Sequence, residues 1–429
     1  MENNTTIGLV PAVARPVNSI RGAWIVLGCA VGMLVGFSAS YFSTLSIFLK
    51  PISAAFGWSR TETSTIASLA QLGLALGAPI AGRLIERLGV LRVALGSTVL
   101  FAAGLLSLSL SSGSVLLFAG LSLLLGFVAV GTTPPGYLSV MPAHFDKRLG
   151  LAMGIAMMGL GFGNALMPLL AQRWIGDGGW QSAYRYVAAA VFIGGLIACL
   201  LLWSAAGAKG SHAERQTLAT AEPASEQSRV WSAVFTWRFV VMIAVFFIVS
   251  CAGLGAIVHM VPLLTDHGLP PAEASKIAAL IGIGVMVGRA GTGALIDVVH
   301  ARYVAAVEFV IGGAGLALIA ISPGSELALM SLGAFAFAFV MGAEGDFIPF
   351  FVRRYFGVSH FSFLYGVLFF FFALGGVAGP VAFGWVFDHF HTYTVAYAGA
   401  GIACVVCAVL VLMLGEYVYP AHRTSGTGN

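Results

Sequence analysis

The chain carries the octapeptide Gly82-Arg83-Leu84-Ile85-Glu86-Arg87-Leu88-Gly89 between two apolar runs, and a shorter copy, Gly293-Ala294-Leu295-Ile296-Asp297, in its second half. Both read glycine, any residue, leucine, any residue, acid. A repeat of this kind predicts a protein built from two similar halves. The runs on either side are about twenty residues long and nearly free of charge, which is the length of an α-helix that crosses a bilayer.

The composition of the whole chain also indicates a membrane protein. Of its 429 residues, 59% are hydrophobic and 9% are charged, and the mean hydropathy is +0.95. An ordinary soluble domain is about 45–50% apolar and about 25% charged, so a soluble domain is excluded. The scarcity of long polar tracts excludes a disordered chain. Continuous apolar runs without strict alternation exclude a membrane barrel and indicate helices.

We predict an all-α membrane protein of twelve transmembrane helices in two pseudo-symmetric six-helix bundles. A polar stretch with the composition of a solvated linker, residues 207–235, separates an N-terminal bundle, residues 1–206, from a C-terminal bundle, residues 236–429. The predicted spans are residues 22–49, 63–82, 92–111, 114–138, 150–172, 183–205, 236–263, 274–296, 302–322, 326–350, 362–386 and 393–417.

Lysine and arginine are distributed unevenly between the two sides that these spans define. Fifteen of the 21 lie on the side of the termini, five lie on the other side, and Arg289 lies inside a span. Because positively charged loops stay in the cytoplasm, we expect a multi-pass protein of the bacterial cytoplasmic membrane with both termini cytoplasmic. The apolar stretch that follows Arg21 is too long for a signal peptide, so we interpret it as the first span.

Several kinds of chemistry have no motif in this sequence. The five cysteines lie inside apolar runs, and Cys404 and Cys407 have no second pair and no histidine beside them, so we expect no metal site. There is no phosphate-binding loop and no Ser/His/Asp constellation, and a net charge of +4 is not a nucleic-acid signal. We therefore expect no enzyme, no cofactor, no nucleotide and no nucleic-acid partner, with membrane lipid as the surroundings.

The octapeptide resembles the loop signature of the major facilitator superfamily, although Glu86 replaces the usual aspartate and the closing basic residue is displaced to Arg92. A second stretch resembles the fifth-helix signature of the monocarboxylate transporter-like family. It reads His144-Phe145-Asp146-Lys147-Arg148-Leu149-Gly150-Leu151-Ala152-Met153-Gly154-Ile155-Ala156-Met157-Met158-Gly159, with Gly163 following. Two charged positions of animal members are absent, because Ser43 and Val285 stand there. The resemblance implies a major facilitator fold and transport of a small organic monocarboxylate.

The repeated loop supplies the candidates for gating. An acid and a base at a helix end can bridge neighbouring helices in one state and release them in another. The alternative is that these charges only fix the topology. The candidates are Gly82, Glu86, Arg87, Gly89 and Asp297.

Arg289 is the leading candidate for substrate binding. A guanidinium inside the hydrocarbon region is costly unless it faces a cavity and finds a partner. Its planar fork matches a carboxylate, and the resemblance implies a substrate-anion-binding arginine at this position. The alternative is a permanent ion pair with Glu308, Glu344 or Asp346.

Three residues are candidates for carrying a coupled proton. Glu344 and Asp346 lie in the tenth span, where burial favours the protonated form of a carboxylate. His259 lies in the seventh span, and histidine titrates near neutral pH. The alternatives are that the acids bridge to Arg353 or Arg354, and that His259 is a packing residue, as we also expect for Glu308.

Further polar residues extend the predicted substrate site. The double proline in Thr132-Thr133-Pro134-Pro135-Gly136 must break the fourth span, and broken backbone at membrane depth is tolerated where it lines a cavity. Tyr137 follows this break. Together with Tyr137, the remaining candidates for contacting the substrate are Asn164, His259, Tyr41 and Tyr365.

These residues lead us to expect a secondary active transporter that moves a small organic monocarboxylate by alternating access, with a proton as symported partner. An anion exchanger would use the same Arg289 without a proton site. A drug/proton antiporter is a further alternative, against which the lack of a buried acid in the first half argues. A membrane sensor would also fit the fold, but no attached domain supports it.

Overall fold

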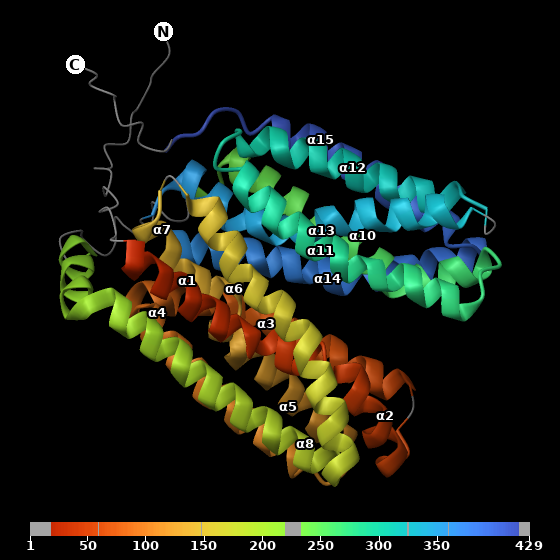
Figure 1. The fold of residues 1–429 in the computed structure, drawn as a ribbon, viewed down its shortest axis with the longest axis horizontal. Coiled ribbons are helices and arrows are strands. Elements are labelled where there is room, and N and C mark those ends of the chain that lie inside the picture. The colour runs from red at the N-terminus through yellow and green to blue at the C-terminus, as the bar shows by residue number, and fades with distance from the viewer. Residues whose placement is uncertain are drawn as a thin grey trace.

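The computed structural model describes residues 19–58, 60–146, 148–218, 233–323, 326–358 and 360–419, which are helical without a strand among them (Figure 1). The first half contains α1 (Ser19–Leu34), the π-helix η1 (Ser38–Phe42), α2 (Leu45–Phe56), α3 (Arg60–Leu88), α4 (Val90–Ser109), α5 (Val115–Val128), the short elements η2 (Ala129–Thr132), α6 (Pro134–Tyr137), η3 (Leu138–Val140) and α7 (Met141–His144), and α8 (Leu149–Leu218). The second half contains α10 (Trp237–Asp266), α11 (Pro271–Leu295), α12 (Ala301–Ile321), α13 (Leu327–Phe356), α14 (Phe361–Phe390) and α15 (Thr394–Leu412).

The helices account for the spans that the sequence predicts. Ten stretches of the described residues are long and apolar enough to cross a membrane, and one of them, Leu149–Ala205, has 57 residues. A single crossing takes about 20 residues, so this stretch is long enough for two. With α11, which has 25 residues, the expected all-α fold of twelve spans is confirmed.

The element α8 consists of two spans that run in opposite directions. Gly179 has a φ of +78°, a conformation that glycine adopts without strain, and it lies between the fifth and sixth predicted spans. The first part of α8 packs on α1 in parallel order and the second part in reverse order. The contacts that show this are Gly159 with Ala30 and Gly163 with Leu34, then Ala198 with Gly28 and Gly194 with Val35.

The predicted linker is helical at its start. The second part of α8 continues through residue 207 to Leu218, and residues 219–232 lie outside the described residues. Seven of the twelve residues 207–218 are alanine, lysine, glutamate, arginine, glutamine or leucine, which favour a helix.

The first span is broken, which the sequence reading of a continuous run did not predict. α1 ends at Leu34, and the π-helix η1 and then α2 follow. Side-chain hydroxyls in this segment bond to backbone carbonyls, as Ser40 does to Val35 at 2.9 Å and Ser43 to Ala39 at 2.6 Å. Hydroxyls that bond locally in this way bend or interrupt helices.

The fourth span is broken where the double proline predicts. α5 ends at Val128, and Thr133 is extended, with ψ of 175°, immediately before α6. Proline has no N–H to continue a helical ladder, so the chain restarts its helix at Pro134. This break positions Tyr137 beside α1, because a Cβ added at Gly32 would overlap the Tyr137 ring.

The same helix pairings occur in both halves, in agreement with the sequence repeat. α1 packs on the first part of α8 as α10 packs on α14, and α3 packs on α5 as α11 packs on α13. The second part of α8 packs on α4 as α12 packs on α15. Across the two bundles, α3 contacts α14 and α11 contacts α8, which are equivalent positions in the repeat.

The two bundles meet at one end of the molecule and separate toward the other (Figure 1). An apolar cluster at the first end contains residues of both bundles, among them Ile25, Met141, Phe239 and Phe361. At the other end each bundle has its own cluster, around Trp180 in one and Tyr397 in the other. We call the joined end the basic face; α1 begins there, and it includes residues 144–146, 148–149, 296–301, 356–358 and 360–361.

Candidate functional site

Arg289 lies on α11 at the interface between the two bundles. Its Nε–H donates to the carbonyl oxygen of Gly342 on α13 at 2.9 Å, and Nη1 donates to the carbonyl oxygen of Met157 on α8 at 3.0 Å. The backbone of α8 approaches closely here, since a Cβ at Gly154 would lie 3.1 Å from the carbonyl oxygen of Arg289. The guanidinium therefore contacts the backbone of both halves.

The structure does not show the permanent ion pair that was the alternative for Arg289. No carboxylate oxygen of the described residues lies within 4.0 Å of its guanidinium nitrogens. A guanidinium has five N–H donors, and two of them are used by the carbonyl groups of Gly342 and Met157. Three donors remain, one on Nη1 and two on Nη2, and a bidentate contact with a carboxylate uses one from each of these nitrogens.

Glu344 and Asp346 on α13 lie within electrostatic range of Arg289. Their side chains are 3% and 0% exposed. One Glu344 oxygen and both Asp346 oxygens have no hydrogen-bond partner among the described residues. Tyr365 on α14 is also buried and lies within electrostatic range of Asp346 and Arg289. The structure thus brings four of the predicted residues together.

The predicted alternative partners of Asp346 are engaged elsewhere. Arg354 Nη1 contacts Asp146 Oδ1 at 2.9 Å, and Arg353 lies 3.7 Å from the same oxygen. Arg354 also donates to the backbone oxygen of Asp146 at 2.7 Å. Asp146 precedes α8 in the other bundle, so these arginines join the bundles at the basic face instead of neutralising Asp346.

Tyr137 and Asn164 lie in the N-terminal bundle. Tyr137 is fully buried, and its hydroxyl has no hydrogen-bond partner among the described residues. Asn164 is exposed and accepts a hydrogen bond from the Ser38 hydroxyl at 3.4 Å. Since residues three and four apart share a helix face, Asn164 lies on the face of α8 that carries Gly154 and Met157, farther from the basic face.

Tyr41 and His259 have partners within their own bundles. The Tyr41 hydroxyl donates to Ser122 at 2.8 Å inside the N-terminal bundle. His259 lies 3.1 Å from the carbonyl oxygen of Pro380, and its ring packs at a tilt beside that of Tyr393, with ring centroids 4.9 Å apart. These contacts agree with packing roles, and the roles of both residues in binding stay predictions.

Two acids of the repeated loop cap helices of the opposite bundle. Glu86 accepts the N–H of Phe363 at 3.0 Å, at the start of α14. Asp297 accepts the N–H groups of Gly150 and Leu151, each at 2.8 Å, at the start of α8. Acids at helix N-termini satisfy free N–H groups and the helix dipole. We call these two contacts the symmetric caps.

Gly82 and Gly89 have backbone reasons to be glycine. A Cβ at Gly82 would overlap the carbonyl oxygen of Ser362, so this glycine permits the close approach of α14. Gly89 has a φ of +86° between α3 and α4. Arg87 is exposed, which agrees with the alternative that it contributes to topology.

Burial changes the titration of Asp297. It raises the pKa of this carboxyl above its ordinary value, against the two backbone N–H groups and the Arg354 and Arg148 cations, which lower it. The cap on α8 needs the ionised, acceptor-only form. This contact therefore weakens at a higher pH than an ordinary aspartate would allow.

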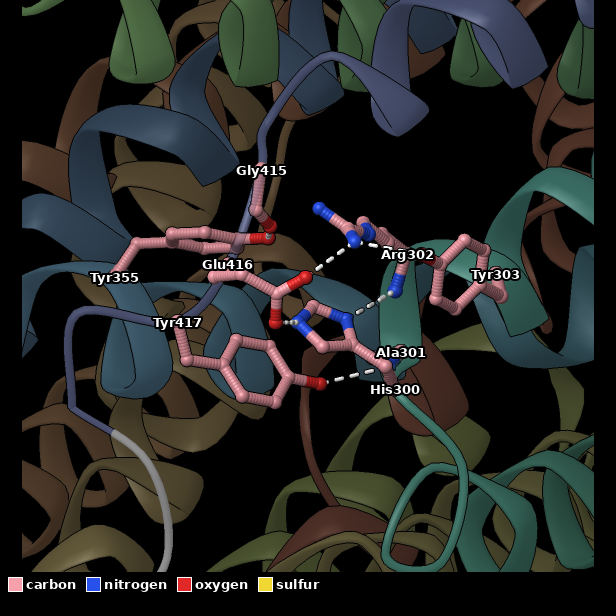
Figure 2. A network of polar contacts seen from close by, with 8 residues as sticks. All are labelled: His300, Ala301, Arg302, Tyr303, Tyr355, Gly415, Glu416 and Tyr417. Carbon is pink, nitrogen blue, oxygen red and sulfur yellow. Dashed lines mark hydrogen bonds and ion pairs between the residues drawn. The ribbon is translucent and has the colours of Figure 1, made fainter.

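The sequence reading missed a network on the basic face of the C-terminal bundle, shown in Figure 2. The ring of His300 stacks on Tyr417 with centroids 3.7 Å apart, and Tyr417 accepts the N–H of Ala301 at 2.7 Å. Glu416 contacts Arg302 at 2.5 Å and His300 at 3.5 Å. We call this set the tail clasp, because it holds residues 415–417 against the start of α12.

The contacts that Asp146 and Thr292 make with other helices were also not predicted. Asp146 is part of the quoted fifth-helix signature, so its charge was visible, but its partners Arg353 and Arg354 are distant in sequence. Thr292 donates to Glu308. Its position one helical turn after Arg289 was the feature of the sequence that could have indicated this contact. Among the described residues, no group of acids, histidines and cysteines fits a metal ion.

Known proteins resemble this chain along most of its length. Monocarboxylate transporter 12 of Rattus norvegicus is 23% identical and aligns with 93% of this chain and 86% of its own. Monocarboxylate transporter 13 of the same species is 25% identical, with 86% of each chain covered. The uncharacterized MFS-type transporter YhjX of Escherichia coli (strain K12) is 24% identical over 84% of this chain and 88% of its own.

Solved structures support the fold. The Escherichia coli fucose:proton symporter FucP has a TM-score of 0.71 at 14% identity and covers 93% of this chain and 99% of its own. The proton:xylose symporter XylE has a TM-score of 0.71 at 15% identity, covering 94% and 97%. The sequence model of the Major Facilitator Superfamily matches residues 29–352. With its two six-helix halves and its symmetric caps, the chain belongs to the major facilitator superfamily and is a membrane transporter.

Proposed function

We propose that this transporter moves a small organic monocarboxylate together with a proton by alternating access. The observation that carries the proposal is the state of Arg289. It is a permanent cation inside a span, held by two backbone carbonyl groups and paired with no carboxylate of the described residues. A substrate carboxylate is the partner that its free donors fit. The names of the relatives, monocarboxylate transporters, support the same substrate class.

Proton coupling is supported by two buried acids within electrostatic range of Arg289. Glu344 and Asp346 are buried and their oxygens are not fully hydrogen-bonded. When a substrate anion neutralises Arg289, a nearby carboxylate loses its compensating charge and binds a proton more readily. Two solved neighbours are named as proton symporters, which agrees with this scheme. His259 is the alternative proton carrier, although its contacts are with Pro380 and Tyr393.

The movement itself follows from the contacts between the bundles. In this structure the symmetric caps and the Asp146 ion pairs join the basic face, while the bundles are apart at the other end. Arg289 touches α8 through Met157, so substrate binding acts directly on the bundle interface. We infer that the basic face is cytoplasmic, since most lysines and arginines lie on that side, and that the structure is open toward the outside.

The test is uptake of radiolabelled acetate, pyruvate, L-lactate and benzoate into liposomes that contain the purified protein, with and without an inward proton gradient. We expect the gradient to drive accumulation of at least one of these acids above its equilibrium level. Liposomes without protein give the background of passive permeation.

The result also separates the alternatives. Uptake that requires a second carboxylate inside the liposome and ignores the gradient would identify an exchanger. Efflux of a cationic dye against the gradient, without uptake of any acid, would identify a drug/proton antiporter. Either outcome would overturn the symport proposal.

A further inference from the structure

Glu308 on α12 is a second buried acid close to Asp346 on α13. Glu308 is 4% exposed and Asp346 is 0% exposed. The next residues of the two helices, Phe309 and Phe347, pack against each other with ring centroids 6.2 Å apart, so the two acids lie at the same level of the contact between α12 and α13. One oxygen of Glu308 and both oxygens of Asp346 lack a hydrogen-bond partner among the described residues.

Ionisation of both carboxylates at once is unfavourable at this buried position. In the part of the chain that the structure describes, no Lys, Arg or His nitrogen lies within 4.0 Å of either one. Arg289 is within electrostatic range of Asp346, but Glu344 is within electrostatic range of the same guanidinium. One cation does not compensate three buried acids, and like charges in a low-dielectric site disfavour each other's ionised form. At least one proton therefore resides among them.

Thr292 connects this acidic site to the helix that carries Arg289. Its hydroxyl donates to Glu308 Oε1, and it is fully buried. Gly293, the next residue, packs against the backbone of Gly150 in the other bundle. The hydrogen bond from Thr292 thus ties Glu308 to the part of α11 that touches α8.

We propose that Asp346 and Glu308 form a pair that shares the transported proton, and that Thr292 transmits the charge state of this pair to α11. This inference rests on the proposed proton coupling and assigns it to two residues. Asp346 is the member that faces the substrate site, because it lies near both Arg289 and Tyr365. Glu308 is the member nearer the basic face, about 10 Å along α12 from Ala301 at the helical rise.

The proton step balances without any other reactant. A proton from water on the open side bonds to an Asp346 oxygen. Because the two carboxylates are not hydrogen-bonded to each other, a bridging water accepts this proton and donates one to Glu308 Oε2, which releases it to water on the basic face. One O–H bond forms and one breaks at each transfer, and nothing is oxidised or reduced. Because substrate binding and protonation both act on Asp346 through Arg289, each favours the other, as reciprocal linkage requires.

The direct test is infrared spectroscopy of the purified protein over a pH series, which detects the carbonyl stretch of a protonated carboxyl group without needing substrate. We expect a band that titrates in the wild type, shifts in frequency in Thr292→Val, and disappears in Asp346→Asn. Glu308→Gln should move its midpoint by at least about one pH unit, a tenfold change in proton affinity. Glu326→Gln, the same change at an exposed acid, is the matched control.

A transport measurement then separates this inference from the proposed function. With an acid that the wild type accumulates, Glu308→Gln should lower gradient-driven uptake by about tenfold or more and retain exchange at equal pH. If the wild type transports no acid but the infrared band changes as expected in Asp346→Asn and Glu308→Gln, the proposal that the two acids share a proton is supported and the substrate assignment is wrong. If Glu308→Gln leaves both the band and driven uptake unchanged, the pair is wrong.

Discussion

The two bundles share a framework but differ in the chemistry of their interiors. All buried charged side chains of the described residues, Glu308, Glu344, Asp346, Arg353 and Arg354, lie in the C-terminal bundle. The buried polar residues of the N-terminal bundle are serines and threonines, such as Ser122 and Thr132, alongside tyrosines. The N-terminal bundle has instead the broken backbone, at η1 and at η2–α6. The comparison indicates that one half holds the charges and the other shapes the space around the substrate.

The largest effect that tests this comparison is expected at Arg289. Arg289→Ala should weaken carboxylate binding by about 2–5 kcal/mol, the usual cost of removing one member of a buried charge pair. Arg289→Lys should also fail to restore transport, because an ammonium lacks the bidentate fork. Tyr137→Phe, in the other bundle, should lose about 1 kcal/mol, as for one hydrogen bond. Binding by isothermal titration calorimetry and membrane abundance are measured together.

Equal losses of binding free energy in the Arg289 and Tyr137 variants would contradict the inference that the two bundles contribute differently to the substrate site. Wild-type binding by Arg289→Ala would refute the substrate site itself.

The next effect tests what the bundles have in common. Gly73 of α3 and Gly288 of α11 occupy equivalent pairings, and a Cβ at either would overlap a backbone carbonyl oxygen, that of Leu123 or Phe339. Gly73→Val and Gly288→Val should each destabilise the fold by about 1–3 kcal/mol, as overpacking does. Thermal unfolding in detergent measures the loss. Gly120→Val is the control, because nothing lies within 4 Å of its added Cβ.

If only one of the two substitutions destabilises the protein, the halves do not share a packing framework. A large loss in the Gly120 variant would mean that valine itself, and not the close approach, is responsible.

A smaller effect compares the symmetric caps. Asp297 accepts the N–H groups of Gly150 and Leu151, and Glu86 accepts that of Phe363; a cap contributes about 1 kcal/mol. Asp297→Ala and Glu86→Ala should therefore each open the basic face, as distances between spin labels on the two bundles would show. Because burial raises the pKa of Asp297, acidification should open the wild type and leave Asp297→Ala unchanged. Identical distances in all variants and at all pH values would contradict this.

The smallest effect concerns the tail clasp. Burial and the Arg302 cation lower the pKa of His300, and Glu416 opposes them. The folded protein thus favours neutral His300, whose ring accepts the Arg302 N–H at the start of α12. In the unfolded chain the group takes up a proton near pH 6.5, so stability should fall as the pH drops below about 6.5. The change should stay below about 1 kcal/mol, because solvent screens a group at the surface.

Melting temperatures measured on both sides of that pH provide the test, with His300→Gln as the variant. A slope that persists in His300→Gln would assign the pH dependence to other groups.

The fold could be predicted from the apolar runs of the sequence, whereas the partners of most polar side chains could not. The apolar runs, the double proline at Pro134 and the glycine–leucine–acid repeat each act locally, and the structure agrees with them. The break after Leu34 was missed, because hydroxyls that bond to the backbone leave no strong periodic signal in an apolar run.

The same limit applies to the site. Arg289 was visible as the one cation that lies more than two residues from either end of a predicted span. Its contact with Met157, and those of Arg354 with Asp146, join residues more than 130 positions apart. Such partners depend on how the two bundles are docked, which no local pattern in one sequence specifies. The same docking decides which of the buried acids faces the guanidinium.

The tail clasp has a practical consequence for anyone who labels this protein. A fluorescent or affinity fusion joined at Leu414 would delete the ring that stacks on His300, the carboxylate that holds Arg302 and the Tyr419 N–H that bonds to Arg354. The start of α12, and with it the helix that carries Glu308, would lose its outer support. A fusion joined after Tyr419 keeps these contacts, and the two attachment points should differ in yield and in monodispersity on size exclusion.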